Sequence, residues 1–109
     1  MGLLTRKEGM SVADFQRYWR DIHGPLVVAE LTGMRRYVQS HALPETYARP
    51  TPPAWDGIAK AWFDSLEAYP PGLGLRREVP PRSAATRDTA SFIKQPIPSL
   101  VVREVIILD

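Results

Sequence analysis

Two histidines and one tyrosine are the residues of this chain best suited to moving a proton. The imidazoles of His23 and His41 titrate near neutrality, so either can accept or donate a proton at physiological pH. Tyr37, four positions before His41, adds a phenolic hydroxyl that can hydrogen-bond to a ligand. The residue types therefore favour acid–base catalysis, with His23 as the acid or base and with Tyr37 and His41 orienting or polarising the ligand.

Other kinds of chemistry have little support in the sequence. It contains no cysteine, which excludes disulfides, thiolate metal sites and a cysteine nucleophile. The two histidines lie too far apart to form a helical His-x-x-x-His pair, so no metal site is expected. The sequence also lacks a phosphate-binding glycine loop, a dinucleotide fingerprint and a nucleophile elbow. We therefore expect chemistry that needs no cofactor.

A helix that begins at Ser11 is expected to position His23. Ser11 is a favourable N-cap residue, and Asp14 places a carboxylate in the first turn, where the helix dipole favours it. Apolar residues then recur at helical spacing: Val12, Phe15, Trp19 and Ile22. This stripe predicts a helix that packs one face against the rest of the domain.

The same helix is expected to end at His23. Gly24 can adopt the left-handed conformation that closes a helix, and Pro25 disfavours helical geometry at the residue before it. His23 would then lie in the last turn or just beyond it. Two roles stay open for this histidine: proton transfer, or hydrogen bonding to the free carbonyls of the helix end.

Two strands follow, and they carry the remaining candidate site residues. Residues 34–43 alternate in character, so Tyr37, Gln39 and His41 should share one face. Asp56 and Gly57 introduce a second strand over residues 58–63, in which Trp62 is either a platform for a flat ligand or a core residue. We assign Trp62, Gln39 and Asp56 as candidate ligand-binding residues.

The complete pattern predicts one α+β domain over residues 1–109. The order strand, helix, strand, strand, helix, strand is the split β-α-β-β-α-β arrangement, with an antiparallel sheet. Prolines should disrupt the second helix and leave residues 70–85 irregular, followed by a short helical turn over residues 86–93 that presents Phe92 to the core. In residues 99–108 both sets of alternating side chains are largely aliphatic, so we expect a last strand with both faces covered. One small domain rarely covers both faces of a sheet, so we also expect a homodimer.

Charge and hydropathy narrow the partners and the compartment. The net charge is only +2, and the paired basic residues are dispersed along the chain, which does not favour nucleic-acid binding. No apolar run is long enough to span a membrane, and no apolar segment follows the first charged residues as in a signal peptide. A cytoplasmic protein is expected.

Several runs of the sequence resemble the EthD family of small ferredoxin-like proteins: RKEGMS, YWRDIHGPLV, MRRYVQSHAL, DGIAKAWFDSLEA and VVREVIIL. The resemblance implies a homodimer whose two sheets form a dimeric α+β barrel, with a ligand cleft between each sheet and its own helices. It also places His23 at the family's histidine before Gly-Pro. The chain departs from the family where a regular second helix is usual and AYPPGLGLRREVPPRSAAT stands instead.

The family includes proteins of ether degradation, polyketide-tailoring dehydratases or cyclases, and methylmuconolactone isomerases. The resemblance thus implies a cofactor-independent isomerase, dehydratase or cyclase that acts by proton transfer on a small cyclic, aromatic or lactone-like metabolite. The alternative is a non-catalytic module of a degradation pathway that binds a small hydrophobic molecule, so the sequence leaves open whether the chain is an enzyme. A haem-binding dimeric barrel is a third option.

Overall fold

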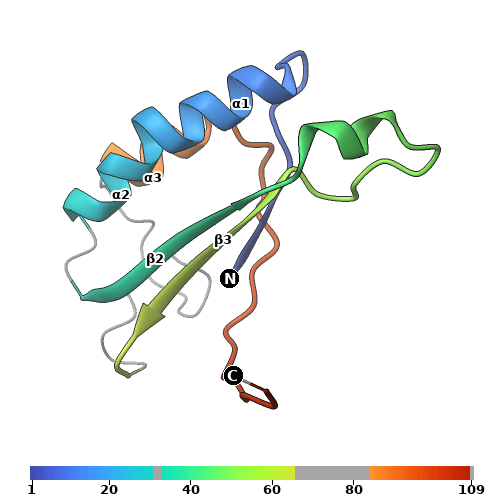
Figure 1. Ribbon diagram of the computed structural model, residues 1–109. Coiled ribbons are helices and arrows are strands. Elements are labelled where there is room, and N and C mark those ends of the chain that lie inside the picture. Colours follow the sequence, from blue (N-terminus) through green and yellow to red (C-terminus); the bar gives the residue numbers. More distant parts are fainter. Residues whose placement is uncertain (31–32, 66–83, 109) are drawn as a thin grey trace.

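The protein is described by a computed structural model covering residues 1–30, 33–65 and 84–108 (Figure 1). Its elements in chain order are β1 (Gly2–Leu4), α1 (Val12–Tyr18), the π-helical segment η1 (Trp19–His23), α2 (Gly24–Glu30), β2 (Met34–His41), the 3-10 helix η2 (Pro44–Ala48), β3 (Gly57–Phe63) and α3 (Ala84–Thr89). Within these ranges, no helix has the length and apolar character needed to cross a membrane.

The three strands form an antiparallel sheet in the order β1-β3-β2. Tyr37 pairs with Ala61 and Gln39 with Ala59, so side chains on one face of β2 stand beside small side chains of β3. The helices lie together on one side of this sheet (Figure 1), and α3 contacts both η1 and α2. The predicted α+β, ferredoxin-like fold is thereby confirmed.

The core lies between the helices and the sheet. Its fully buried members are Phe15, Trp19 and Phe92, and Phe15 lies 5.6 Å from each of the other two rings, measured between ring centroids. Phe92 follows α3, so the expectation that this segment presents Phe92 to the core is confirmed. Gly57 lies directly beneath Trp19: a Cβ atom at this position would overlap the indole ring, so the strand needs glycine there.

The sequence predicted that the helix would end at His23, and this prediction is wrong. The helix begins as expected, with the Ser11 side chain accepting a hydrogen bond from the Asp14 amide, but it continues through a π-helical turn into α2. Gly24 has ordinary right-handed helical angles, and its amide donates to the Trp19 carbonyl five residues earlier. The wider turn accommodates Pro25, whose missing N–H would interrupt a regular α-helix.

The π-helical turn also changes which residues face the core. The buried side chains along this helix are spaced by four, at Phe15, Trp19, His23 and Val27, and Gly24 is buried as well. Ile22, which the predicted stripe included, is 48% exposed, because the additional residue in the turn rotates it away from the sheet. His23 takes the place that Ile22 would occupy in a regular α-helix.

The predicted last strand over residues 99–108 does not form in this chain. Gly2 and Ser99 make an isolated antiparallel bridge, and the Leu100 amide and carbonyl bond to Met1. Among the described residues, no strand pairs with the segment beyond Leu100. Their apolar side chains are exposed, Ile107 by 90% and Leu108 by 93%, and the segment leaves the sheet in Figure 1. The predicted irregular segment 70–85 lies, apart from its last two residues, outside the described residues.

Candidate functional site

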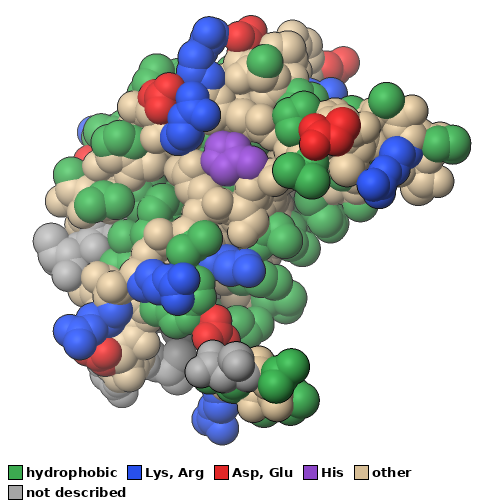
Figure 2. Space-filling model, viewed as in Figure 1, with side chains coloured by type: hydrophobic (Ala, Val, Ile, Leu, Met, Phe, Trp, Pro, Cys, Tyr) green, Lys and Arg blue, Asp and Glu red, His purple; other side chains and the backbone are tan. Residues whose placement is uncertain are grey.

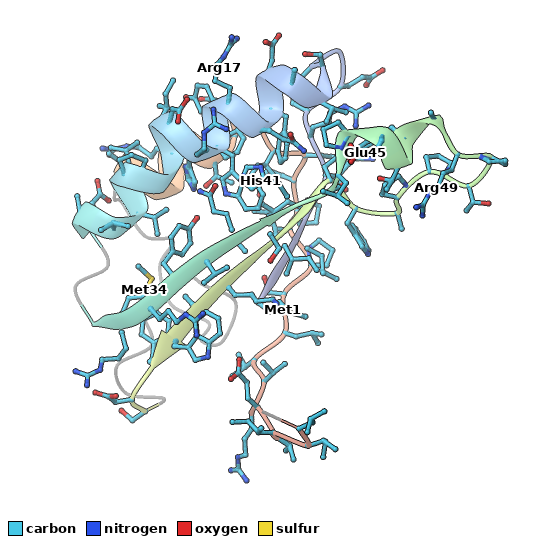
Figure 3. The ribbon with its side chains drawn as sticks, viewed as in Figure 1. Met1, Arg17, Met34, His41, Glu45 and Arg49 are labelled. Atoms are coloured by element: carbon cyan, nitrogen blue, oxygen red, sulfur yellow. The ribbon has the colours of Figure 1, made fainter. Side chains whose placement is uncertain are left out.

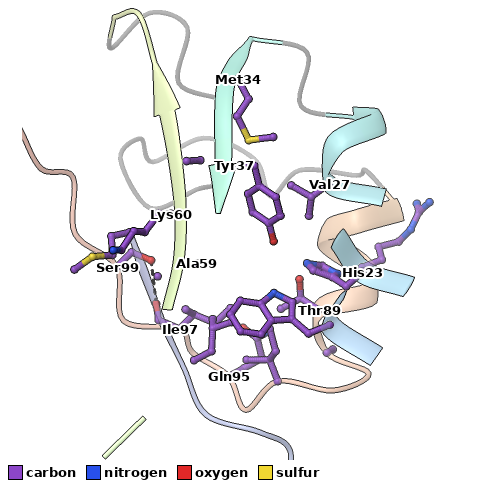
Figure 4. Close-up of a pocket in the computed structure, with 18 of the residues that line it drawn as sticks. His23, Val27, Met34, Tyr37, Ala59, Lys60, Thr89, Gln95, Ile97 and Ser99 are labelled. Atoms are coloured by element: carbon purple, nitrogen blue, oxygen red, sulfur yellow. Dashed lines mark hydrogen bonds between the residues drawn. The ribbon is translucent and has the colours of Figure 1, made fainter. Parts of the chain in front are cut away.

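A cavity of about 570 Å³ lies between the sheet and the helices (Figure 4). Most of its wall is apolar, with contributions from every layer of the fold, among them Trp19, Val27, Met34, Ala59, Ile93 and Ile97. The small side chains of β3 leave this space open, since a larger residue at Ala59 would reach into it. The cavity is large enough for a ring-sized organic molecule.

His23 and Tyr37 both line this cavity. His23 reaches it from η1 and Tyr37 from β2, and Figure 4 shows the Tyr37 hydroxyl directed toward the His23 ring. The structure therefore brings together two of the three side chains that the sequence selected for acid–base chemistry. A basic nitrogen and a phenolic hydroxyl meet at a mostly apolar wall, which Lys60, Arg87, Thr89, Gln95 and Ser99 also line.

The Asp88 carboxylate is the hydrogen-bond partner of the His23 ring. His23 Nδ1 lies 3.1 Å from Asp88 Oδ2, and the side chains of both residues are largely buried. Since an ionised carboxylate only accepts hydrogen bonds, Nδ1 carries the hydrogen and the neutral ring has its lone pair on Nε2. The His23 ring also packs against Phe92, with ring centroids 4.8 Å apart. Asp88 thus fixes both the tautomer and the orientation of the imidazole.

The same carboxylate accepts a second hydrogen bond, from the Tyr18 hydroxyl, at 2.5 Å. This bond raises the pKa of Tyr18, so its hydroxyl stays protonated and continues to donate. Burial lowers the pKa of His23 below its ordinary value of 6.5, and Asp88 acts in the opposite direction through its hydrogen bond and its charge. At neutral pH the site therefore contains a neutral imidazole that can accept a proton.

Burial has the opposite effect on Tyr37. It raises the pKa of this phenol above its ordinary value of 10.0, although hydrogen bonds from Gln39 and Trp19 act in the other direction. Tyr37 is accordingly neutral at physiological pH and retains its hydroxyl hydrogen. The cavity thus combines a proton acceptor with a hydrogen-bond donor, an arrangement suited to proton transfer next to a polar group of a ligand.

His41 lies outside the cavity, although it shares a strand face with Tyr37 as predicted. It stacks on Trp19 with ring centroids 4.4 Å apart, and its Nε2 lies 2.8 Å from Gln39 Oε1. The Gln39 amide nitrogen in turn donates to the Trp19 carbonyl at 2.9 Å and, more weakly, to the Tyr37 oxygen at 3.3 Å. Figure 2 shows a histidine at the surface where Figure 3 labels His41. His41 therefore connects to the cavity indirectly, through Gln39 and through the Trp19 ring that lines it.

Trp62 and Asp56, two of the predicted ligand-binding residues, are not part of the cavity wall. Trp62 lies opposite Arg36 on the other face of the sheet, where the guanidinium packs over the indole at 4.8 Å and the indole N–H donates to Glu104. Asp56 is buried and accepts hydrogen bonds from the Arg6 guanidinium, the Arg6 amide and the Tyr47 hydroxyl. These contacts give Asp56 a structural part, joining the segment after β1 to the start of β3.

Asp88 and Tyr18 are not among the candidate site residues predicted from the sequence. Asp88 lies 65 positions after His23 and meets it only in the folded chain, so local sequence spacing contains no signal for the pair. The only local hint is that Asp88 and Phe92 are four residues apart, the spacing of one helix face, and both contact His23. Within the described ranges, no cluster of three His, Asp or Glu side chains suitable for a metal ion is present.

Comparison with known proteins agrees with this architecture. The family model of the EthD domain matches residues 7–70, which include α1, η1, α2, β2 and β3. No curated protein and no solved structure matches the chain significantly. The family match spans more than half of the 109 residues and includes His23, Tyr37 and the strand that carries His41. On this evidence the chain belongs to the EthD family.

Proposed function

We propose that this protein is a cofactor-independent enzyme that transfers a proton on a small cyclic, aromatic or lactone-like metabolite. The observation that carries the proposal is the orientation of His23: Asp88 binds its Nδ1, while the ring lines an apolar cavity that also receives the Tyr37 hydroxyl. His23 is the base that removes a proton from the ligand and returns it at a second position. An isomerisation, or a proton removal that leads to dehydration or cyclisation, fits this arrangement.

The reaction needs a neutral base near neutral pH, and the buried position of His23 supports one. The lowered pKa of His23 keeps the imidazole unprotonated at pH 7, and the Asp88 carboxylate stabilises the imidazolium formed after proton removal. Both interactions are strengthened where burial and the mostly apolar wall lower the local dielectric constant. Proton transfer from a weakly acidic C–H bond is the class of step that such a site promotes.

Exchange of carbon-bound hydrogen with solvent deuterium tests this proposal without knowledge of the natural substrate. The probe is 2-tetralone, a bicyclic ketone with weakly acidic C–H bonds, in deuterated buffer, and loss of the C1 proton signal is followed by NMR. The wild-type protein should raise the exchange rate above the buffer rate, and His23→Gln should lower this catalysed rate by about 10²- to 10⁴-fold. Equal rates for wild type and His23→Gln, with both folded, would contradict the proposal.

A non-catalytic binding module is the alternative, and one observation favours it. The Asp88 carboxylate joins α3 to both α1 and η1 through Tyr18 and His23, so the same contacts hold the cavity wall in place. In that case His23→Gln would lower stability and ligand affinity together, and the wild-type protein would bind 2-tetralone without accelerating exchange. The exchange measurement therefore separates the two functions.

A further inference from the structure

The orientation of the Gln39 amide is fixed by its surroundings. The Trp19 backbone carbonyl can only accept a hydrogen bond, so the Gln39 group that faces it at 2.9 Å must be the NH₂. The Gln39 carbonyl oxygen then faces His41 Nε2 at 2.8 Å, which requires a hydrogen on that nitrogen. His41 Nε2 carries a hydrogen both in this neutral tautomer and in the imidazolium, so this bond persists when His41 is protonated.

This orientation determines what the Tyr37 hydroxyl can do. The second hydrogen of the Gln39 amide points to the Tyr37 oxygen at 3.3 Å, so Tyr37 accepts from Gln39 and its own hydrogen must go elsewhere. Across the part of the chain that the structure describes, no residue accepts that hydrogen, and the hydroxyl is directed into the cavity (Figure 4). Tyr37 thus presents a donor to a ligand, at the wall where His23 presents an acceptor.

We propose that the cavity selects small apolar compounds with a carbonyl group, whose oxygen accepts the Tyr37 hydrogen bond while the adjacent C–H bond faces His23. Gln39, held by His41 and the Trp19 carbonyl, is the positioning residue that keeps Tyr37 a donor. The inference rests on the proposed function and names its substrate class. In the reacting step the C–H bond breaks, its proton passes to His23 Nε2, and its electron pair moves onto the carbonyl oxygen as an enolate that Tyr37 stabilises.

A matched pair of probes tests the donor directly. 2-Tetralone and tetralin have the same fused ring skeleton and differ in the carbonyl group, and their dissociation constants can be measured by ligand-observed NMR. Wild type should bind 2-tetralone about tenfold more tightly than tetralin, the difference expected from one neutral hydrogen bond. Tyr37→Phe should abolish this preference and leave tetralin affinity unchanged. Equal affinities for the two probes in the wild-type protein, or no binding of either at millimolar concentration, would overturn the assignment.

Gln39→Glu tests the positioning role with little change in shape. A glutamate carboxylate accepts hydrogen bonds only, so it would draw the Tyr37 hydrogen away from the cavity although the tyrosine is still present. The preference for 2-tetralone should therefore fall to the level of Tyr37→Phe. Gln39→Met is the matched control: it has a similar length but neither donates to Tyr37 nor competes for its hydrogen, so its preference should lie between those of wild type and Tyr37→Phe. A preference that survives in folded Gln39→Glu would refute the positioning role, and if this variant does not fold, Tyr37→Phe still decides the donor.

The binding and exchange measurements fail in different ways. If His23-dependent exchange occurs but the ketone preference is absent or independent of Tyr37, the carbonyl inference is wrong and the proton-transfer function stands. If the preference depends on Tyr37 but no exchange occurs, the carbonyl site stands and the proposed catalysis is wrong. If both are observed, Tyr37→Phe should lower the exchange rate without moving the pH dependence set by His23, because this uncharged change acts on the enolate oxygen rather than on the base.

Discussion

Replacing Asp88 with asparagine should remove most of the basicity of His23 while keeping the volume of the side chain. The carboxylate accepts from both Tyr18 and His23, at 2.5 and 3.1 Å. An asparagine has only one accepting oxygen, and the shorter bond favours its use by Tyr18. The asparagine NH₂ would then face His23 Nδ1, which must accept and thereby shifts the ring hydrogen to Nε2. The nitrogen available to the cavity would carry a proton and could no longer act as a base.

The size of the effect follows from these contacts. Losing a correctly oriented base costs about 10²- to 10⁴-fold in rate, or about 3 to 5 kcal/mol of transition-state free energy. The loss of one hydrogen bond to a charged acceptor should also lower the free energy of unfolding by about 1.5 to 3 kcal/mol. Because Asp88 raises the pKa of His23 against the effect of burial, its removal should lower that pKa further.

The assay is the deuterium exchange of 2-tetralone as a function of pH, with urea unfolding as the control for stability. The wild-type rate should rise with pH through the lowered His23 pKa and then level off, since the neutral imidazole is the active form. Asp88→Asn should show a much lower plateau with its inflection moved to lower pH. A variant that is folded yet exchanges at the wild-type rate would refute the assignment of Asp88 as the residue that orients the base.

Three further outcomes are expected. We propose that the chain forms a homodimer in which the exposed aliphatic segment beyond Leu100 is covered, so sedimentation should give about twice the 12.3 kDa chain mass. Val105 is 73% exposed in the single chain, and Val105→Asp should yield a monomer. The control Val28→Asp, on α2, should leave the dimer intact. Gly57→Ala should destabilise the fold by about 1 to 3 kcal/mol in urea unfolding, because the new methyl group overlaps the buried Trp19 ring; an unchanged midpoint would contradict that packing. Burial lowers the pKa of both histidines below 6.5, so just below that pH the unfolded chain binds more protons than the folded chain. The free energy of unfolding should therefore fall as the pH decreases through this interval, and it should fall less steeply in His23→Gln. A free energy of unfolding that rises on acidification there would contradict this sign.

Local sequence signals predicted the start of the helix and the faces of the strands. The Ser11 cap forms as its residue type indicates, and the period of two puts Tyr37, Gln39 and His41 on the same side of β2. The end of the helix was not predictable in the same way, because Gly24-Pro25 is compatible with either a cap or a π-helical turn. Tertiary contact decides between them: a Cβ atom at Gly24 would lie 2.8 Å from the Gln39 amide nitrogen, so the strand packs directly on this turn.

The site was predictable only as far as local patterns extend. A regular α-helix, with 3.6 residues per turn, would direct Ile22 toward the sheet after Trp19. The wider π-helical turn instead directs His23 toward the cavity. Asp88 meets His23 across 65 positions, beyond any spacing rule. The last strand failed for a similar reason, since its aliphatic pattern describes side chains suited to a sheet but not whether a neighbouring strand is present to pair with it.

The protonation state of the His23 ring tests the central claim most directly. Two-dimensional ¹⁵N–¹H NMR of the imidazole groups, recorded across the acid range with the His41→Gln variant to assign the signals, reports both the tautomer and the pKa. The structure predicts a neutral ring with its hydrogen on Nδ1, a pKa below 6.5, and a shift of the Nε2 signal when 2-tetralone is added. A hydrogen on Nε2 of the neutral ring, or an Nε2 signal that does not respond to the saturating ketone, would contradict His23 as the base of this site.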